Sequence, residues 1–139
     1  IGKANVAVIS KRKIDIKKLP LYNRIIYKTD PEFIYQLNNW WNQHFDIPAK
    51  ITMNVDSVTT CKKLVRDNLG YGIIAIDYLY EFEKEDLFIT NLTDVNGKKI
   101  TRDTTMIYTE KSLKSSIVRA FVNHIEEMFK CNNVRDNKY

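Results

Sequence analysis

The side chains best placed to do chemistry are hydroxyl and acidic groups between an apolar run and an amphipathic run. Asp56, Ser57 and Thr59 follow the alternating stretch KITMNV and lead into CKKLVR. Asp and Ser are favoured caps at the start of a helix, where the first backbone N–H groups lack partners and can bind an anion or a polar group. A cap formed by Asp56 would repel an anion, so Ser57 and Thr59 are the better ligand candidates. Capping alone also explains all three residues.

A second group repeats this arrangement at Tyr27, Lys28, Thr29 and Asp30, which follow the apolar run RIIY. Thr29 and Glu32 have the spacing of a capping box, which predicts a helix start. Thr29 and the first-turn amides could bind a carboxylate or another polar group, and Lys28 could add positive charge. Capping by Thr29 and Asp30 without any ligand remains the alternative.

Residues suited to catalysis or metal binding are isolated in the sequence. His44 and His124 each stand in an expected helix without a second ligand or a nucleophile at useful spacing. The segment 70–72 lacks the third glycine of a dinucleotide-binding fingerprint, and no P-loop is present. Cys61 and Cys131 form neither a disulfide framework nor a zinc pattern. The sequence therefore predicts no enzyme, no metal site and no cofactor, and favours binding over catalysis.

Length and charge are those of one globular domain. The chain has 139 residues, 44% of them hydrophobic and 28% charged, which argues against disorder. No run approaches the roughly 20 apolar residues of a membrane span. The chain opens on Ile1 rather than Met, so we expect a missing upstream piece. The net charge of +5 is concentrated before residue 31. Such a basic segment could bind nucleic acid, but a solvated loop is favoured because aromatic residues are not interleaved with the Lys and Arg residues. The basic residues there are Lys3, Lys11, Arg12, Lys13, Lys17, Lys18, Arg24 and Lys28.

Hydrophobic periodicity places strands and helices in alternation. Strands are predicted at 5–9, 24–27, 50–55, 72–76, 87–90 and 100–109, and helices at 31–45, from 57 to a turn at Asn68–Gly70, and 115–129. This order implies right-handed crossovers, and therefore an α/β fold with a mostly parallel sheet and helices on both faces.

Several local features carry narrower expectations. Asn68 and Gly70 tolerate positive φ, so they should let the chain turn after its helix. Residues 78–86 should form a polar-aromatic linker. Trp40 and Trp41 point about 100° apart on a helix, so one is expected in the core and the other half exposed. The wide apolar stripe of helix 115–129 requires a partner surface, and either Ser112 or Ser115 should cap that helix.

Three segments in order resemble the effector-binding domain of LysR-type transcriptional regulators. They are NRIIYKTDPEFIYQLNNWW at 23–41, VDSVTTCKKLVRDNLGYGIIAI at 55–76 and SSIVRAFVNHIEEMF at 115–129. The resemblance spans roughly residues 5–129. The chain departs from the pattern at Asn68, where many members have Gly, and at Ala75 and Ile76, where many have Pro.

The resemblance implies one lobe of a periplasmic-binding-protein type 2-like fold. Residues 1–103 would be the second lobe of the effector-binding domain, 104–130 the returning strand and C-terminal helix, and 131–139 a polar tail. The first lobe's opening half and the helix-turn-helix would lie outside this chain. The effector site would include Tyr27, Lys28, Thr29, Asp30, Ser57 and Thr59.

The function implied is that of a cytoplasmic, homodimeric regulator whose small-molecule effector binds between two lobes. The basic start favours an anionic effector, and DNA would be bound only through the helix-turn-helix domain, with no role for a membrane. One alternative is an extracytoplasmic solute-binding protein of the same fold. Another is a plain interaction module that docks through its last helix.

Overall fold

The computed structural model describes the backbone of residues 2–104 and 114–136. The chain divides into two compact units, Asn5–Arg102 and a second made of Ile1–Ala4 and Asp103–Tyr139. Each unit is described by itself below.

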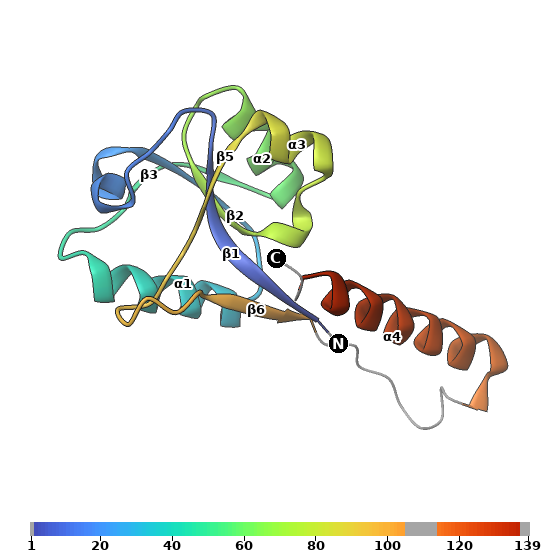
Figure 1. The fold of residues 1–139 in the computed structure, drawn as a ribbon. Coiled ribbons are helices and arrows are strands. Elements are labelled where there is room, and N and C mark those ends of the chain that lie inside the picture. Colours follow the sequence, from blue (N-terminus) through green and yellow to red (C-terminus); the bar gives the residue numbers. More distant parts are fainter. Residues whose placement is uncertain (1, 105–113, 137–139) are drawn as a thin grey trace. The chain divides into compact units, whose positions relative to one another are not determined.

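The elements follow the predicted alternation of strands and helices (Figure 1). In chain order they are β1 (Gly2–Ser10), the 3-10 helix η1 (Ile16–Leu21), β2 (Asn23–Tyr27), α1 (Pro31–His44), β3 (Lys50–Val55), α2 (Val58–Arg66), β4 (Gly72–Ala75), the 3-10 helix η2 (Ile76–Tyr78), α3 (Glu81–Asp86), β5 (Phe88–Asn91), β6 (Thr101–Thr104) and α4 (Ser116–Asp136).

The strands combine parallel and antiparallel pairing. β2 and β3 are parallel, and a parallel bridge from Arg24 to Tyr71 joins β2 to the residue before β4. β1 lies between β4 and β5 and is antiparallel to both, while β6 also pairs with β1. The α/β class is confirmed, and β2, β3, β4 and β5 share one direction. The antiparallel pairs of β1 were not predicted, because β1 is followed by a loop with η1 and not by a crossover helix to a neighbouring strand.

Helices cover both faces of the sheet in unit Asn5–Arg102, as predicted (Figure 1). Val6 and Val8 of β1 pack in one core with α1, whereas Ile9 packs in a second core with Cys61 and Val65 of α2. Because side chains alternate across a strand, β1 contributes to both cores. The sheet is therefore buried on both sides.

Both tryptophans of α1 are buried, so the prediction that one is half exposed was wrong. Trp40 is 3% exposed and Trp41 is 5% exposed. The Nε1 of Trp40 donates to the carbonyl of Thr93, and the Nε1 of Trp41 donates to the carbonyl of Ile47, both at 2.8 Å. Since both indole N–H groups have acceptors, both rings can be buried without losing a hydrogen bond.

The expected linker at 78–86 contains the short helix α3 instead. Its six residues, EFEKED, have no apolar periodicity, and its buried residue is Glu83 rather than a hydrophobic side chain. The Glu83 carboxylate accepts from Lys62 Nζ (2.9 Å) and from the backbone N–H of Tyr80 (3.1 Å). Helix α3 therefore rests on a buried ion pair with α2, which periodicity does not reveal.

Helix α4 belongs to the second unit and continues to Asp136, beyond the predicted end near residue 129. Ser115 directly precedes it, whereas Ser112 lies outside the described residues, as does the 105–109 part of the predicted strand. Val122 is buried, but Ile117 and Phe121 of the predicted apolar stripe are exposed.

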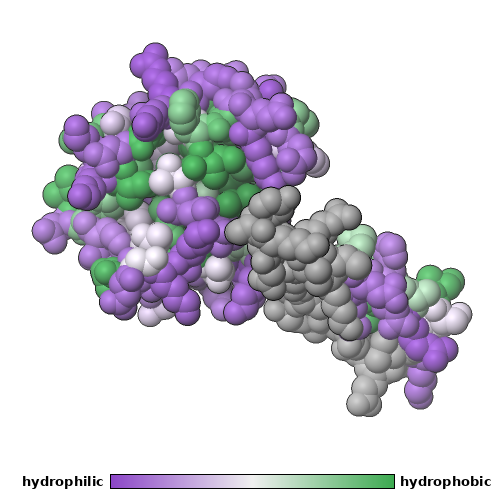
Figure 2. Space-filling model, in the orientation of Figure 1, coloured by the Kyte–Doolittle hydropathy of each residue, from purple (hydrophilic) through white to green (hydrophobic). Residues whose placement is uncertain are grey.

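The surface of unit Asn5–Arg102 is mixed in character. Figure 2 shows hydrophilic side chains over most of the visible face, with apolar areas between them. Lys11 of the basic start forms an ion pair with Asp86, which also accepts from Arg66 (3.3 Å), so the basic loop is partly neutralised. Within residues 2–104 and 114–136, no helix is both long and apolar enough to cross a membrane.

Candidate functional site

The two segments singled out in the sequence reach the same edge of the sheet. Tyr27 lies opposite Val55 in the parallel β2–β3 pair, and the backbone N–H of Lys28 donates to the carbonyl of Val55 (3.0 Å). α1 begins at Pro31 and α2 at Val58, directly after these strand ends. Two helix N-termini therefore open at the carboxyl ends of neighbouring parallel strands, which is where α/β sheets bind ligands.

Asp30, not Thr29, caps helix α1. The Oδ1 of Asp30 accepts from the backbone N–H of Phe33 (2.9 Å), and Asp30 also forms an ion pair with Arg102. The hydrogen bond from Phe33, helped by the charge of Arg102, holds the pKa of Asp30 below its ordinary value. The Thr29–Glu32 capping box was therefore wrong, and the Asp30 carboxylate is already occupied by protein partners.

Ser57 caps helix α2, which settles the choice between Asp56 and Ser57. Its Oγ accepts from the backbone N–H of Thr60 (3.3 Å) and lies 3.2 Å from Thr60 Oγ1. The first turn of α2 contains no acidic residue. Since the first amides of a helix have no partner inside it, those of Val58 and Thr59 are available to a polar or anionic group.

The remaining predicted residues differ in exposure. Thr29 is partly exposed and its Oγ1 lies 3.4 Å from Asp30 Oδ2, while Lys28 and Thr59 are exposed. Tyr27 is partly buried, its hydroxyl has no hydrogen-bond partner among the described residues, and burial raises its pKa above the ordinary value. The edge thus presents hydroxyls, backbone amides and one lysine.

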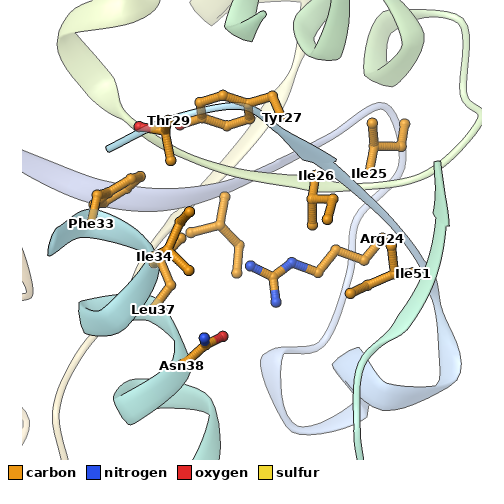
Figure 3. A pocket seen from close by; sticks show the side chains of 11 residues that line it. Arg24, Ile25, Ile26, Tyr27, Thr29, Phe33, Ile34, Leu37, Asn38 and Ile51 are labelled. Carbon is orange, nitrogen blue, oxygen red and sulfur yellow. The ribbon is translucent and has the colours of Figure 1, made fainter. Parts of the chain in front are cut away.

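Below this edge lies a cavity of about 270 Å³ between β2, β3 and α1. Tyr27 and Thr29 line it, but Lys28, Asp30, Ser57 and Thr59 do not. Figure 3 shows the side chain of Arg24 extending from β2 towards Leu37 and Asn38 of α1. Sequence reasoning missed Arg24, because it was counted with the basic start. The sequence feature that could have indicated a buried Arg24 is its position in a predicted strand, where its side chain lies on the same face as that of Ile26.

The described residues hold no catalytic constellation or metal cluster. No group of three His, Cys, Asp or Glu side chains in the described ranges could hold a metal ion. Burial raises the pKa of the Cys61 thiol to about 11, and the ring of His44 stacks on Trp40 while its Nδ1 lies 2.8 Å from the Trp40 carbonyl. Cys61 is therefore a poor nucleophile and His44 is a packed helix residue.

Curated relatives are similar over most of the chain. It is 34% identical over 119 residues to the uncharacterized HTH-type transcriptional regulator YraN of Bacillus subtilis, covering 86% of this chain and 40% of that protein. It is 32% identical over 104 residues to the uncharacterized HTH-type transcriptional regulator YkuM of the same organism, covering 75% of this chain and 35% of that protein. The chain thus spans about two fifths or less of these relatives.

Solved structures share the fold at low sequence identity. The regulatory domain of CcmR from Synechocystis PCC6803, in complex with 2-PG, matches 93% of this chain and 64% of that chain, with a TM-score of 0.62 and 13% identity. CbnR, a LysR family transcriptional regulator, matches 72% of this chain and 37% of that chain, with a TM-score of 0.53 and 11% identity.

The family itself follows from the sequence match. The family model described as the LysR substrate binding domain matches residues 5–130, which is most of the chain. The fold neighbours agree with the α/β fold expected from the sequence. This chain therefore belongs to the LysR substrate-binding domain family.

Proposed function

We propose that the chain is the effector-sensing part of a LysR-type transcription regulator that binds DNA through a helix-turn-helix domain outside this sequence. Two observations support the proposal. The curated relatives are named HTH-type transcriptional regulators and are more than twice as long as the matched segment. The CcmR regulatory domain, which shares the fold, is titled as a complex with the small molecule 2-PG.

Within that regulator, residues 1–103 would form the second lobe and 104–130 the strand and helix that return to the first lobe, with 131–139 as a tail. The compact unit Asn5–Arg102, which has its own sheet and cores, supports the first of these boundaries. An effector bound between two lobes would shift their relative orientation and thereby the arrangement of the DNA-binding domains.

The observation that carries the proposal is the parallel β2–β3 pair, which brings two helix N-termini to one edge. Ser57, Thr59 and the first amides of α2 would bind the polar or anionic group of the effector. Thr29 and Lys28 would add a hydroxyl and a charge from the neighbouring segment. Tyr27 would close the apolar side. Asp30 would act through its cap and its ion pair with Arg102 rather than by accepting the effector directly.

The proposed role as a regulator also leads to expectations about enzymatic activity, oligomeric state, location and the class of effector. We expect no enzymatic activity, since binding free energy alone is needed to shift a conformational equilibrium. We expect a homodimer that acts in the cytoplasm, where the DNA is, with no membrane partner. The effector would be a small metabolite, with an anion favoured by the amides of α2.

The test is a DNase I footprint of the full-length protein encoded by the gene on its bound promoter. The footprint is recorded with and without the dialysable small-molecule fraction of a cell extract. We expect that fraction to change the affinity or the extent of protection, with an affinity change of about 5-fold or more, as is typical of allosteric coupling. The dialysed macromolecular fraction is the control. Identical footprints under all conditions would contradict effector sensing.

A further inference from the structure

Arg24 is buried and forms no ion pair with any carboxylate of the described residues. Its side chain rises from β2 into the cavity between β2, β3 and α1, and the residue is 8% exposed (Figure 3). Among the described residues its Nε has no hydrogen-bond partner. The guanidinium carbon lies 5.8 Å from the centre of the Trp41 ring, a cation–π contact that gives the Nε–H no acceptor.

The titratable groups that act on Arg24 carry no negative charge. They are Tyr71, Cys61 and Tyr27. Burial raises the pKa of Tyr71 to about 12 and that of Cys61 to about 11, so both are neutral at physiological pH. Desolvation lowers the pKa of Arg24 from its ordinary value, but a guanidinium stays protonated in proteins. A buried charge without a counter-ion is costly, and an anion entering the cavity would remove that cost.

The rest of the lining is mainly apolar. Ile26, Ile34, Leu37 and Ile51 form the walls, and Asn38 supplies an amide. With about 270 Å³, the cavity lies just below the roughly 300–1,000 Å³ of sites for drug-sized ligands. One fork of N–H donors inside apolar walls matches a carboxylate on a compact hydrocarbon body better than a hydrated, multiply charged phosphate.

We propose that this cavity binds a small organic carboxylate, with its two oxygens on the Arg24 guanidinium and its hydrocarbon body against Ile34, Leu37 and Ile51. The cavity does not include the α2 cap, because neither Ser57 nor Thr59 lines it, but it shares Tyr27 and Thr29 with the proposed effector site. Carboxylate binding in this cavity requires neither DNA binding nor an effector between lobes. A negative result for the cavity would therefore leave the proposed function unaffected.

The direct test is a titration of the 139-residue chain with cyclohexanecarboxylate, followed by ¹H–¹⁵N NMR. Its uncharged analogue, cyclohexanecarboxamide, has nearly the same shape. We expect the carboxylate to shift the amide signals of Ile26, Ile34 and Asn38. We expect the carboxamide to bind about tenfold more weakly or not at all, because hydrogen bonds to charged groups are the stronger ones. Equal affinity for the two compounds, or shifts confined to other residues, would overturn the proposal.

Matched variants separate the role of Arg24 from general effects of charge. Arg24→Met should abolish the preference for the carboxylate, whereas Arg66→Met, which removes a surface arginine paired with Asp86, should keep it. If far-UV circular dichroism shows that Arg24→Met does not fold, Asn38→Trp retains Arg24 while filling the cavity mouth, and should abolish binding. Wild-type affinity in a folded Arg24→Met or in Asn38→Trp would overturn the proposal. So would concentration-dependent shifts of the same amides without ligand, which would place a second copy of the chain in the cavity.

Discussion

At the residue scale, Gly70 lets two backbones approach each other. The N–H of Tyr71 donates to the carbonyl of Asn23, and the N–H of Ile25 donates to the carbonyl of Tyr71, both at 2.9 Å. A Cβ added at Gly70 would lie 2.6 Å from the Asn23 oxygen, too close for any side chain. Positive φ was expected at Asn68 and Gly70; Asn68 adopts it, with a φ of 62°, whereas Gly70 does not. The glycine is needed to place β2 beside β4.

We therefore predict that Gly70→Ala lowers the free energy of unfolding by about 2 kcal/mol, because overpacked sites typically cost 1–3 kcal/mol. Asn68→Gly in the same turn is the control and should change stability by less than about 1 kcal/mol, since glycine adopts positive φ readily. Urea denaturation followed by tryptophan fluorescence measures both variants. If Gly70→Ala were as stable as the wild type, the backbones at Gly70 and Asn23 would not be in close contact, contrary to the structure.

At the element scale, the buried pair Lys62–Glu83 holds α2 and α3 together. Lys62 Nζ donates to Glu83 and to the carbonyl of Tyr78 (2.7 Å), and its ammonium lies 4.8 Å from the centre of the Tyr80 ring. Burial alone would raise the pKa of Glu83. The hydrogen bonds from Lys62 and from the backbone of Tyr80 outweigh it, so the pKa lies below the ordinary value.

Glu83→Ala should destabilise the protein by about 3 kcal/mol, because it leaves the Lys62 charge buried and unpaired. The double variant Lys62→Met/Glu83→Leu should lose much less, since it removes both charges. The lowered pKa of Glu83 means that its contribution is present above its unfolded pKa of about 4.3 and is lost as the pH falls through the folded value. Denaturation midpoints between pH 7 and pH 3 should therefore fall more steeply in the wild type than in the double variant. Parallel pH profiles would contradict a paired, ionised Glu83.

Some helices and strands could be predicted from the sequence, and others could not. Phe33, Leu37 and Trp40 recur at helical spacing and are buried in α1, so periodicity sufficed to predict this helix, although not the burial of both tryptophans. Helix α3 was missed because an ion pair rather than an apolar stripe buries it. The direction of β1 depends on which strands lie beside it, and spacing along the chain does not determine this. Arg24 was missed because a charged residue is usually exposed, and only the assembled cavity shows that this one is not.

At the scale of the whole molecule, the proposed effector site lies along one edge of the sheet. The unit Asn5–Arg102 has cores on both faces of its sheet, and this edge is formed by the ends of β2 and β3 and the first turns of α1 and α2. In the proposed regulator, the first lobe would close over this edge. The hydroxyls at Thr29 and Ser57 would then complete their hydrogen bonds with an effector rather than with water.

The most direct test of that account is a pair of substitutions at Ser57 in the full-length regulator, measured as promoter response to the dialysable extract fraction in a reporter strain. Asn and Asp are equally good helix caps, so Ser57→Asn and Ser57→Asp should fold alike. Only Asp places a negative charge at the N-terminus of α2. We expect Ser57→Asn to keep most of the response and Ser57→Asp to reduce it about tenfold, the effect of roughly 1.4 kcal/mol of lost binding free energy. Wild-type response in both variants would contradict effector binding at the α2 cap.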